Sequence, residues 1–162
     1  MSYVINEVMS DEHIVKSYNR TLLLYHLVLP AKCRLKVFTP AVEETLRQVC
    51  LKIEECYEIR FVEIGMEADH VHFLVQGVPT MTVSTIVKTI KSITAREIFK
   101  AHPGLKKDLL WGGKVWTSGF YANTVGLYAS KDTIKRYIQN QGKDGGEYRK
   151  VYENQPELDF GG

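Results

Sequence analysis

Two histidines, His70 and His72, lie two positions apart in an apolar stretch of the sequence. In an extended strand, residues two apart project from the same face, so both imidazoles would point the same way. The alternating residues Val71 and Phe73 are apolar and would face a core. Two adjacent imidazoles can bind one divalent metal ion. A pair with this spacing alone is more typical of half-exposed strand histidines that bind nothing, and only a third ligand would favour the metal site.

A second candidate pair, Tyr137 and Gln141, lies towards the C-terminal end. Residues four apart lie on the same face of a helix, one above the other. Ile134 and Ile138 border this pair and can anchor the helix on a sheet. The helix could carry the groups that the histidine pair lacks, although Tyr137 can also be an ordinary packing residue of an amphipathic helix.

Positive charge is concentrated in one part of the chain, although the net charge is only +2. Between Thr82 and Trp116 there are seven basic residues and two acidic ones. Affinity for a nucleic-acid backbone rises with the number of cations that a surface presents, so this segment could bind phosphates. A solvated helix face would have the same composition, and charge alone does not distinguish the two.

The hydrophobic pattern predicts the elements that must position these residues. Alternating apolar and β-branched residues predict strands at residues 21–29, 59–66, 70–78 and 115–125. Apolar residues spaced three and four apart predict helices at residues 40–57, 83–99 and after Ser130. Thr39 is the expected cap of the first helix, with Pro40 at its first position. A break at Pro103-Gly104 and a basic loop are expected to follow the second helix.

The order strand, helix, strand, strand, helix, strand predicts an α+β fold of the ferredoxin-like (RRM-like) kind. Its antiparallel sheet would carry two helices on one face and leave the other face open. The helix that bears Tyr137 would be an additional C-terminal element. We expect one domain over residues 13–142 and a flexible C-terminal tail over residues 143–162. The fold alone does not define a function, because RNA-binding domains, metal chaperones and enzymes share it.

Length and composition exclude several classes of protein. The 162 residues, with 44% hydrophobic and 25% charged side chains, are typical of one folded domain. No apolar run approaches the roughly 20 residues that span a bilayer, and no signal-peptide pattern opens the chain, which favours a cytoplasmic protein without a membrane partner. Three cysteines without Cys-x-x-Cys spacing indicate neither a disulfide framework nor a zinc knuckle, and we expect them to be reduced and buried.

Taken together and in this order, the motifs resemble those of the single-tyrosine HUH transposases (TnpA), which move minimal bacterial and archaeal insertion sequences as single-stranded DNA. The resemblance runs from about residue 21 to residue 141. The matching stretches are Tyr25-His26-Leu27-Val28, Ala68-Asp69-His70-Val71-His72-Phe73-Leu74-Val75, residues 87–100, residues 110–117 and Ile134-Lys135-Arg136-Tyr137-Ile138-Gln139-Asn140-Gln141.

The resemblance implies a role for each candidate residue. Tyr137 would be the catalytic nucleophile, and His70, His72 and Gln141 would bind a divalent metal ion, Mg²⁺ or Mn²⁺. Residues 13–142 would form the catalytic domain of a DNA transposase. This enzyme would recognise subterminal hairpins and would cleave and rejoin single-stranded DNA at insertion-sequence ends through a 5′-phosphotyrosine intermediate. DNA contacts are expected from Lys88, Lys91, Arg96, Lys100, Lys106, Lys107 and Arg136.

Two further expectations concern assembly and the first strand. A long aromatic strand at the sheet edge is available to pair with a second copy, which predicts a two-fold homodimer. The resemblance implies shared active sites, with Tyr137 of one chain joining His70 and His72 of the other. His26, on the first strand, is interpreted as a packed core histidine and is left out of the site.

Other functions remain compatible with the sequence. A domesticated relative could use the same residues on chromosomal palindromic repeats. A non-catalytic RRM-like module would instead carry aromatic residues at the positions of His70 and His72, where bases stack. A metal sensor or carrier would need no nucleophile. Covalent attachment of the chain to labelled single-stranded DNA would separate the enzyme from both non-enzymes.

Overall fold

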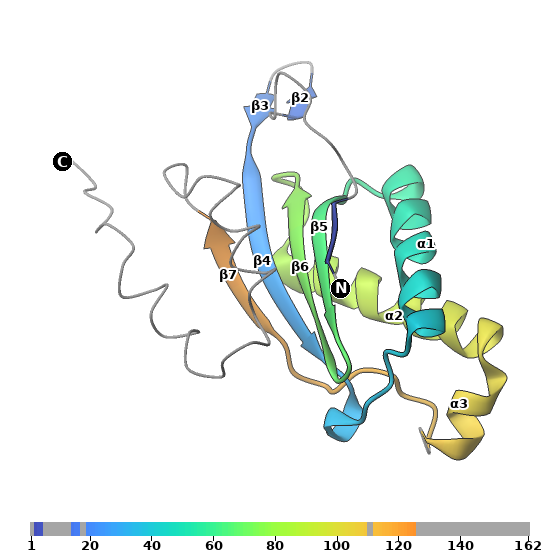
Figure 1. Cartoon of the computed structure of the whole chain (residues 1–162). Coiled ribbons are helices and arrows are strands. Elements are labelled where there is room, and N and C mark those ends of the chain that lie inside the picture. The colour runs from blue at the N-terminus through green and yellow to red at the C-terminus, as the bar shows by residue number, and fades with distance from the viewer. Residues whose placement is uncertain (1, 5–13, 17–18, 110–111, 126–162) are drawn as a thin grey trace.

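The computed structural model describes residues 2–4, 14–16, 19–109 and 112–125 (Figure 1). The predicted helix after Ser130, which would carry Arg136, Tyr137 and Gln141, and the predicted tail at residues 143–162 lie outside these described residues. The expected domain boundaries therefore stay predictions.

A five-stranded antiparallel sheet forms the centre of the fold. In spatial order its strands are β1 (Ser2–Val4), β5 (Arg60–Glu67), β6 (His70–Gly77), β4 (Leu23–Pro30) and β7 (Tyr121–Val125). The last four strands, with α1 (Pro40–Cys56) and α2 (Val83–Ala101), follow the chain order strand, helix, strand, strand, helix, strand. The predicted α+β, ferredoxin-like fold is confirmed. Strand β1 extends the sheet beyond β5, and β2 (Ile14–Lys16) pairs separately with β3 (Asn19–Thr21).

The two main helices begin where the sequence predicts. The Thr39 hydroxyl accepts a hydrogen bond from the Val42 amide at 3.4 Å, and Pro40 occupies the first position of α1. Thr82 caps α2 in the same way by accepting from the Thr85 amide at 3.1 Å. Each cap satisfies an amide that has no partner within its own helix.

Two local predictions were wrong after α2. The basic segment is not a loop there, because Pro103 starts a short helix, α3 (Pro103–Asp108). The last strand is also shorter than predicted. The Val115 carbonyl accepts a backbone hydrogen bond from Lys32 of the 3-10 helix η1 (Lys32–Arg34), and the Thr117 amide donates to Pro30 at the end of β4. Trp116 forms an isolated bridge with Ala31, but regular pairing starts only at Tyr121. Between these two regions, the Lys91 side chain of α2 donates hydrogen bonds to the carbonyls of residues 117–119.

The main core lies between the sheet and the two helices, which cover the same face of the sheet (Figure 1). Val71, Phe73 and Val75 of β6 are buried in it together with apolar residues of α1 and α2. The opposite face was expected to be open, and this is wrong for its centre, where Leu74 and Gln76 are also buried. A small apolar cluster, Leu24, Val62 and Leu74, lies on that second face.

Two expectations from composition can be compared with the structure. The cysteines are all free, but only Cys50 is buried, whereas Cys33 and Cys56 are exposed. The expectation that all three are buried is therefore wrong. Among the helices that the structure describes, none is long and apolar enough to cross a membrane.

A buried hydrogen bond joins the segment before β7 to helix α2. The Trp116 Nε1–H donates to Thr94 Oγ1 at 3.0 Å, and the Thr94 hydroxyl donates to the Ile90 carbonyl at 2.6 Å. The Trp116 ring packs against Phe38, with ring centroids 5.1 Å apart. Trp116 therefore ties the connection into β7 to the core.

We expect Thr94→Val to destabilise the fold by about 1–3 kcal/mol, because it leaves the buried indole N–H without its acceptor. The double variant Trp116→Phe/Thr94→Val has neither group, so its cost should be smaller than the sum of the two single variants. Equilibrium urea unfolding of the four proteins measures this coupling. Strictly additive free energies of unfolding would show that the hydrogen bond contributes nothing.

Candidate active site

Strand β6 brings His70 and His72 to the same face of the sheet, opposite the helices. Val71 and Phe73, which alternate with them, are buried in the main core. The two imidazole centroids are 4.9 Å apart and their rings are nearly perpendicular. In the sheet register, His72 lies between Val28 of β4 and Gly65 of β5. The geometry predicted for the histidine pair is therefore present.

An acidic residue orients His70. His70 Nδ1 lies 2.6 Å from Asp69 Oδ1, and Arg34 Nε donates to Asp69 Oδ2 at 3.0 Å. Burial raises the pKa of Asp69, but the hydrogen bond from His70 and the charge of Arg34 outweigh it, so the pKa lies below its usual value. The ionised carboxylate can only accept, so His70 Nδ1 carries the proton. In the neutral ring, Nε2 then carries the lone pair that a metal ion requires.

A third histidine, His26 of β4, orients His72. The two rings stack with centroids 5.4 Å apart, and His26 Nε2 lies 3.1 Å from His72 Nδ1. Burial lowers the pKa of His72 to about 2 and that of His26 to about 4, with neighbouring positive charge adding to the shift of His72. Both rings are therefore neutral near pH 7, which is the form that binds metals.

These contacts fit a metal ion at the histidine pair. His72 is only 2% exposed, and its Nε2 has no hydrogen-bond partner among the residues that the structure describes. A buried nitrogen without a partner is costly unless a ligand satisfies it. No group of three or more His, Cys, Asp and Glu side chains suitable for a metal occurs in the described part of the chain. A further ligand is needed, and Gln141, the predicted one, lies outside that part.

His26 is the residue that the sequence interpretation left out. It is buried, at 3% exposure, as predicted for a packed histidine, but it packs directly on His72. Strand alternation contained the signal: Leu27 and Leu29 face the main core, so His26 must face the other side with the histidine pair. What the sequence does not show is that β4 and β6 are neighbours.

Most of the predicted DNA-binding cations are exposed in the structure. Lys88, Arg96 and Lys100 are exposed on α2, and Lys106 and Lys107 are exposed on α3. Arg96 Nε also contacts Glu97 Oε1 at 3.4 Å. Arg136 is not among the described residues. These exposed cations keep their predicted role as candidates for phosphate contacts.

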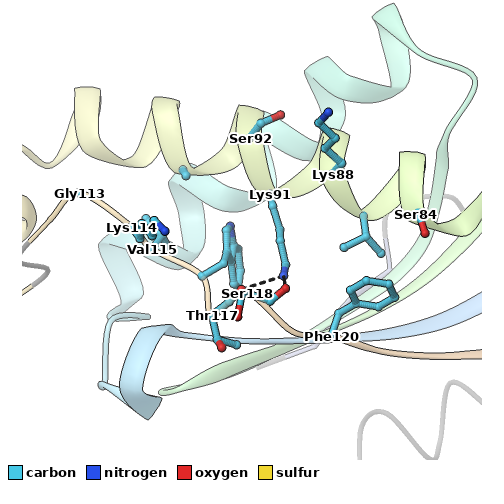
Figure 2. Close-up of a pocket in the computed structure, with 13 residues that line it drawn as sticks. Ser84, Lys88, Lys91, Ser92, Gly113, Lys114, Val115, Thr117, Ser118 and Phe120 are labelled. Carbon is cyan, nitrogen blue, oxygen red and sulfur yellow. Dashed lines mark hydrogen bonds between the residues drawn. The ribbon is translucent and has the colours of Figure 1, made fainter.

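Lys91 differs from the other cations. Its ammonium group donates to the carbonyls of Thr117 at 2.8 Å, Ser118 at 3.3 Å and Gly119 at 2.7 Å (Figure 2). Burial lowers its pKa from the usual value. An ammonium has three donors, and all three are directed at these carbonyls. The structure thus gives Lys91 a positioning role in the turn before β7, and a contact with DNA is not needed to explain it.

The family can be identified by comparison with known proteins. A family model described as "Transposase IS200 like" matches residues 19–141. ISDra2 transposase TnpA of Deinococcus radiodurans is 31% identical over 119 residues, which cover 74% of this chain and 84% of that protein. The transposase for insertion sequence element IS200 of Salmonella typhimurium is 28% identical over 133 residues, covering 82% and 85% respectively.

A solved structure agrees with these sequence matches. The crystal structure of a candidate transposase from Deinococcus radiodurans has a TM-score of 0.62 and 30% sequence identity, and the match covers 79% of this chain and 96% of that one. The predicted resemblance is thus confirmed, because the family model spans more than half of the chain and sequence and structure select the same family. This chain belongs to the IS200-like transposase family.

Proposed function

We propose that this protein is a metal-dependent DNA transposase that cleaves and rejoins single-stranded DNA at insertion-sequence ends. Tyr137 is the nucleophile, and His70, His72 and Gln141 are the ligands of a divalent metal ion, Mg²⁺ or Mn²⁺. One observation supports this most strongly in a chain of the IS200-like transposase family: His72 is neutral and buried, and its Nε2 has no partner among the described residues.

The donor set suits a phosphate substrate. Two neutral imidazoles and one neutral amide oxygen leave the charge of a divalent ion uncompensated. The bound ion would stabilise negative charge on the scissile phosphate and on the departing 3′ oxygen. The residues described above prepare this arrangement, since Asp69 and Arg34 orient His70 and His26 orients His72.

Tyr137 performs the covalent step of the proposal. Its phenolic oxygen forms a bond to phosphorus and loses its proton, while the bond from phosphorus to the 3′ oxygen breaks and that oxygen leaves as a hydroxyl. The product is a 5′-phosphotyrosine, which conserves the energy of the phosphodiester. Rejoining needs only attack by a 3′ hydroxyl, with no nucleotide triphosphate.

The partner in this proposal is single-stranded DNA with hairpin ends. The exposed cations on α2 and α3 support it, because backbone binding depends on the number of lysines and arginines that reach phosphates. A non-catalytic RRM-like module is less compatible with the structure. Such a module stacks bases on aromatic residues of an accessible sheet face, whereas here that face carries the buried imidazoles of His26 and His72.

Replacing Tyr137 by Phe should abolish the covalent complex with a labelled single-stranded DNA end while DNA binding is retained, because only the nucleophilic oxygen is lost. Denaturing gels detect the complex and fluorescence anisotropy measures binding. Tyr57→Phe is the matched control, since Tyr57 is exposed at the end of α1, and it should behave as the wild type. Undiminished complex formation by Tyr137→Phe would remove Tyr137 from the mechanism.

Changes at the histidine pair should act on metal binding. We expect His72→Ala to eliminate specific Mn²⁺ binding and EDTA to stop cleavage, with DNA binding largely unchanged. Asp69→Asn should weaken Mn²⁺ binding by roughly 10–100-fold, because it removes the carboxylate that orients His70. Isothermal titration with Mn²⁺ measures metal binding by the His72→Ala and Asp69→Asn variants.

His102→Ala is the control for these variants, because His102 bonds to Thr45 between α1 and α2 and belongs to no part of the candidate site. It should bind Mn²⁺ as the wild type does. Metal binding that survives in His72→Ala, or cleavage that continues in EDTA, would contradict the assignment.

The proposal includes a homodimer with shared active sites. Transposition joins two DNA ends, and a two-fold pair of chains would hold both of them together. We expect a mixture of Tyr137→Phe and His70→Ala/His72→Ala chains to recover the covalent complex on the histidine-deficient chain. Recovery is expected because one site of each heterodimer then holds the tyrosine of one chain and the histidines of the other. Heterodimers shown to form but remaining inactive would place Tyr137 beside the histidines of its own chain.

A further inference from the structure

A pocket of about 430 Å³ lies between α2 and the segment that leads into β7 (Figure 2). None of its lining residues belongs to the group formed by His26, His70 and His72. Those histidines are on the sheet face opposite the helices, whereas this pocket is bordered by α2. It is therefore separate from the candidate active site, and the proposed chemistry at the histidine pair does not use it.

The walls of this pocket combine an apolar floor with an exposed aromatic ring. Val87, Val115 and Trp116 line it and are buried. Phe120 also lines it and is 43% exposed, so its ring is accessible to a ligand that enters the pocket. Lys91 Nζ lies 5.6 Å from the centre of the Phe120 ring and at the same time holds the preceding carbonyls. Lys91 thus positions the backbone that precedes Phe120 and also contacts its ring.

The charge of the pocket has one sign. Lys88, Lys91 and Lys114 line it together with several hydroxyl groups, and its lining contains no acidic residue. Lys91 is committed to the carbonyls, so the exposed Lys88 and Lys114 are the cations that can meet a ligand. Figure 2 shows Lys88 directed away from the loop, and Lys114 and Phe120 at opposite ends of the pocket.

A second groove, between α1 and α2, differs from this pocket in the charge and type of the residues that line it. It has a volume of about 290 Å³ and is lined by Glu44 and Glu97 as well as Lys52 and Lys100. Its two acidic residues balance its two lysines, and no aromatic residue lines it. An anionic aromatic ligand would therefore favour the first pocket over the second.

We propose that the pocket between α2 and β7 binds one unpaired nucleotide of the DNA substrate. The base contacts Phe120 and the apolar floor, one neighbouring phosphate contacts Lys88, and a phosphate further along the strand contacts Lys114. Proteins that bind single strands combine these two features, a ring on which a base stacks and cations along the backbone. This inference rests on the proposed function and assigns part of the DNA to a site away from the scissile phosphate.

The test measures the base and phosphate contributions separately. Fluorescence anisotropy compares an oligothymidylate of about fifteen nucleotides, within the size range of single-strand sites, with an abasic oligomer of the same length. The wild type should prefer the thymidylate by about fivefold or more. Phe120→Ala should lose this preference and leave abasic binding unchanged, because it removes only the stacking surface.

Lys88→Ala should have the complementary effect. It should keep the preference for thymidylate but lower the slope of log affinity against log salt by about one phosphate contact. Lys52→Ala is the matched control, because it removes an exposed lysine from the charge-balanced groove, and it should change neither quantity. Both Phe120 and Lys88 are exposed, so neither substitution should disturb the core.

The outcomes separate this inference from the proposed function. If the wild type prefers thymidylate and Phe120→Ala keeps that preference, the pocket assignment is overturned and the transposase proposal stands. If the wild type binds neither oligomer, the pocket assignment is overturned, and the covalent complex with hairpin-ended DNA still decides the transposase proposal. If the wild type binds the two oligomers equally, the pocket holds no base, and the nucleotide assignment is overturned while the transposase proposal stands.

Discussion

The antiparallel pairing of β4 with β6 is the constraint on which the candidate active site depends. Its register runs from Leu23 opposite Gly77 to Pro30 opposite His70. This register places His26 and His72 on one face at a diagonal, where their rings stack and their nitrogens meet. A shift of one residue would turn His26 into the main core and leave His72 without its partner. The buried alternation of Leu27 and Leu29 against Val71 and Phe73 makes such a shift very unfavourable.

The residues that stabilise the sheet and the residues of the candidate site lie on opposite faces of it. The face under the helices is filled with apolar side chains, whereas the other face buries Glu63 and Gln76 as well as His26 and His72. Buried polar groups stabilise a fold only when hydrogen bonds or ligands satisfy them. Natural proteins retain such groups where function requires them, and depend on a conventional core elsewhere. The division between the two faces is what lets the sheet hold neutral imidazoles without losing its fold.

Much of the fold could be predicted because its signals are local. The cap at Thr39 and the alternation along β6 depend on residues close together in the sequence, and the structure contains both. The omission of His26 from the site and the misplaced start of the last strand involve contacts between distant segments. His26 and His72 are 46 residues apart, and Lys91 is 26 residues from Thr117, so no local pattern reveals either contact. The same tertiary contact explains why residues predicted as strand before Tyr121 form a turn around a lysine.

The hydrogen bonds from Lys91 to three successive carbonyls also limit which residues can replace this lysine. A lysine ammonium behaves as a compact, nearly spherical cation, and the backbone folds around it as it would around a bound metal ion. Arginine has the same charge, but its planar fork cannot direct donors at three carbonyls that surround a single point. Exchange of Lys91 for arginine is thus not conservative in this protein. Among relatives, a change at this position should be accompanied by a change in the length or sequence of the turn at residues 117–119.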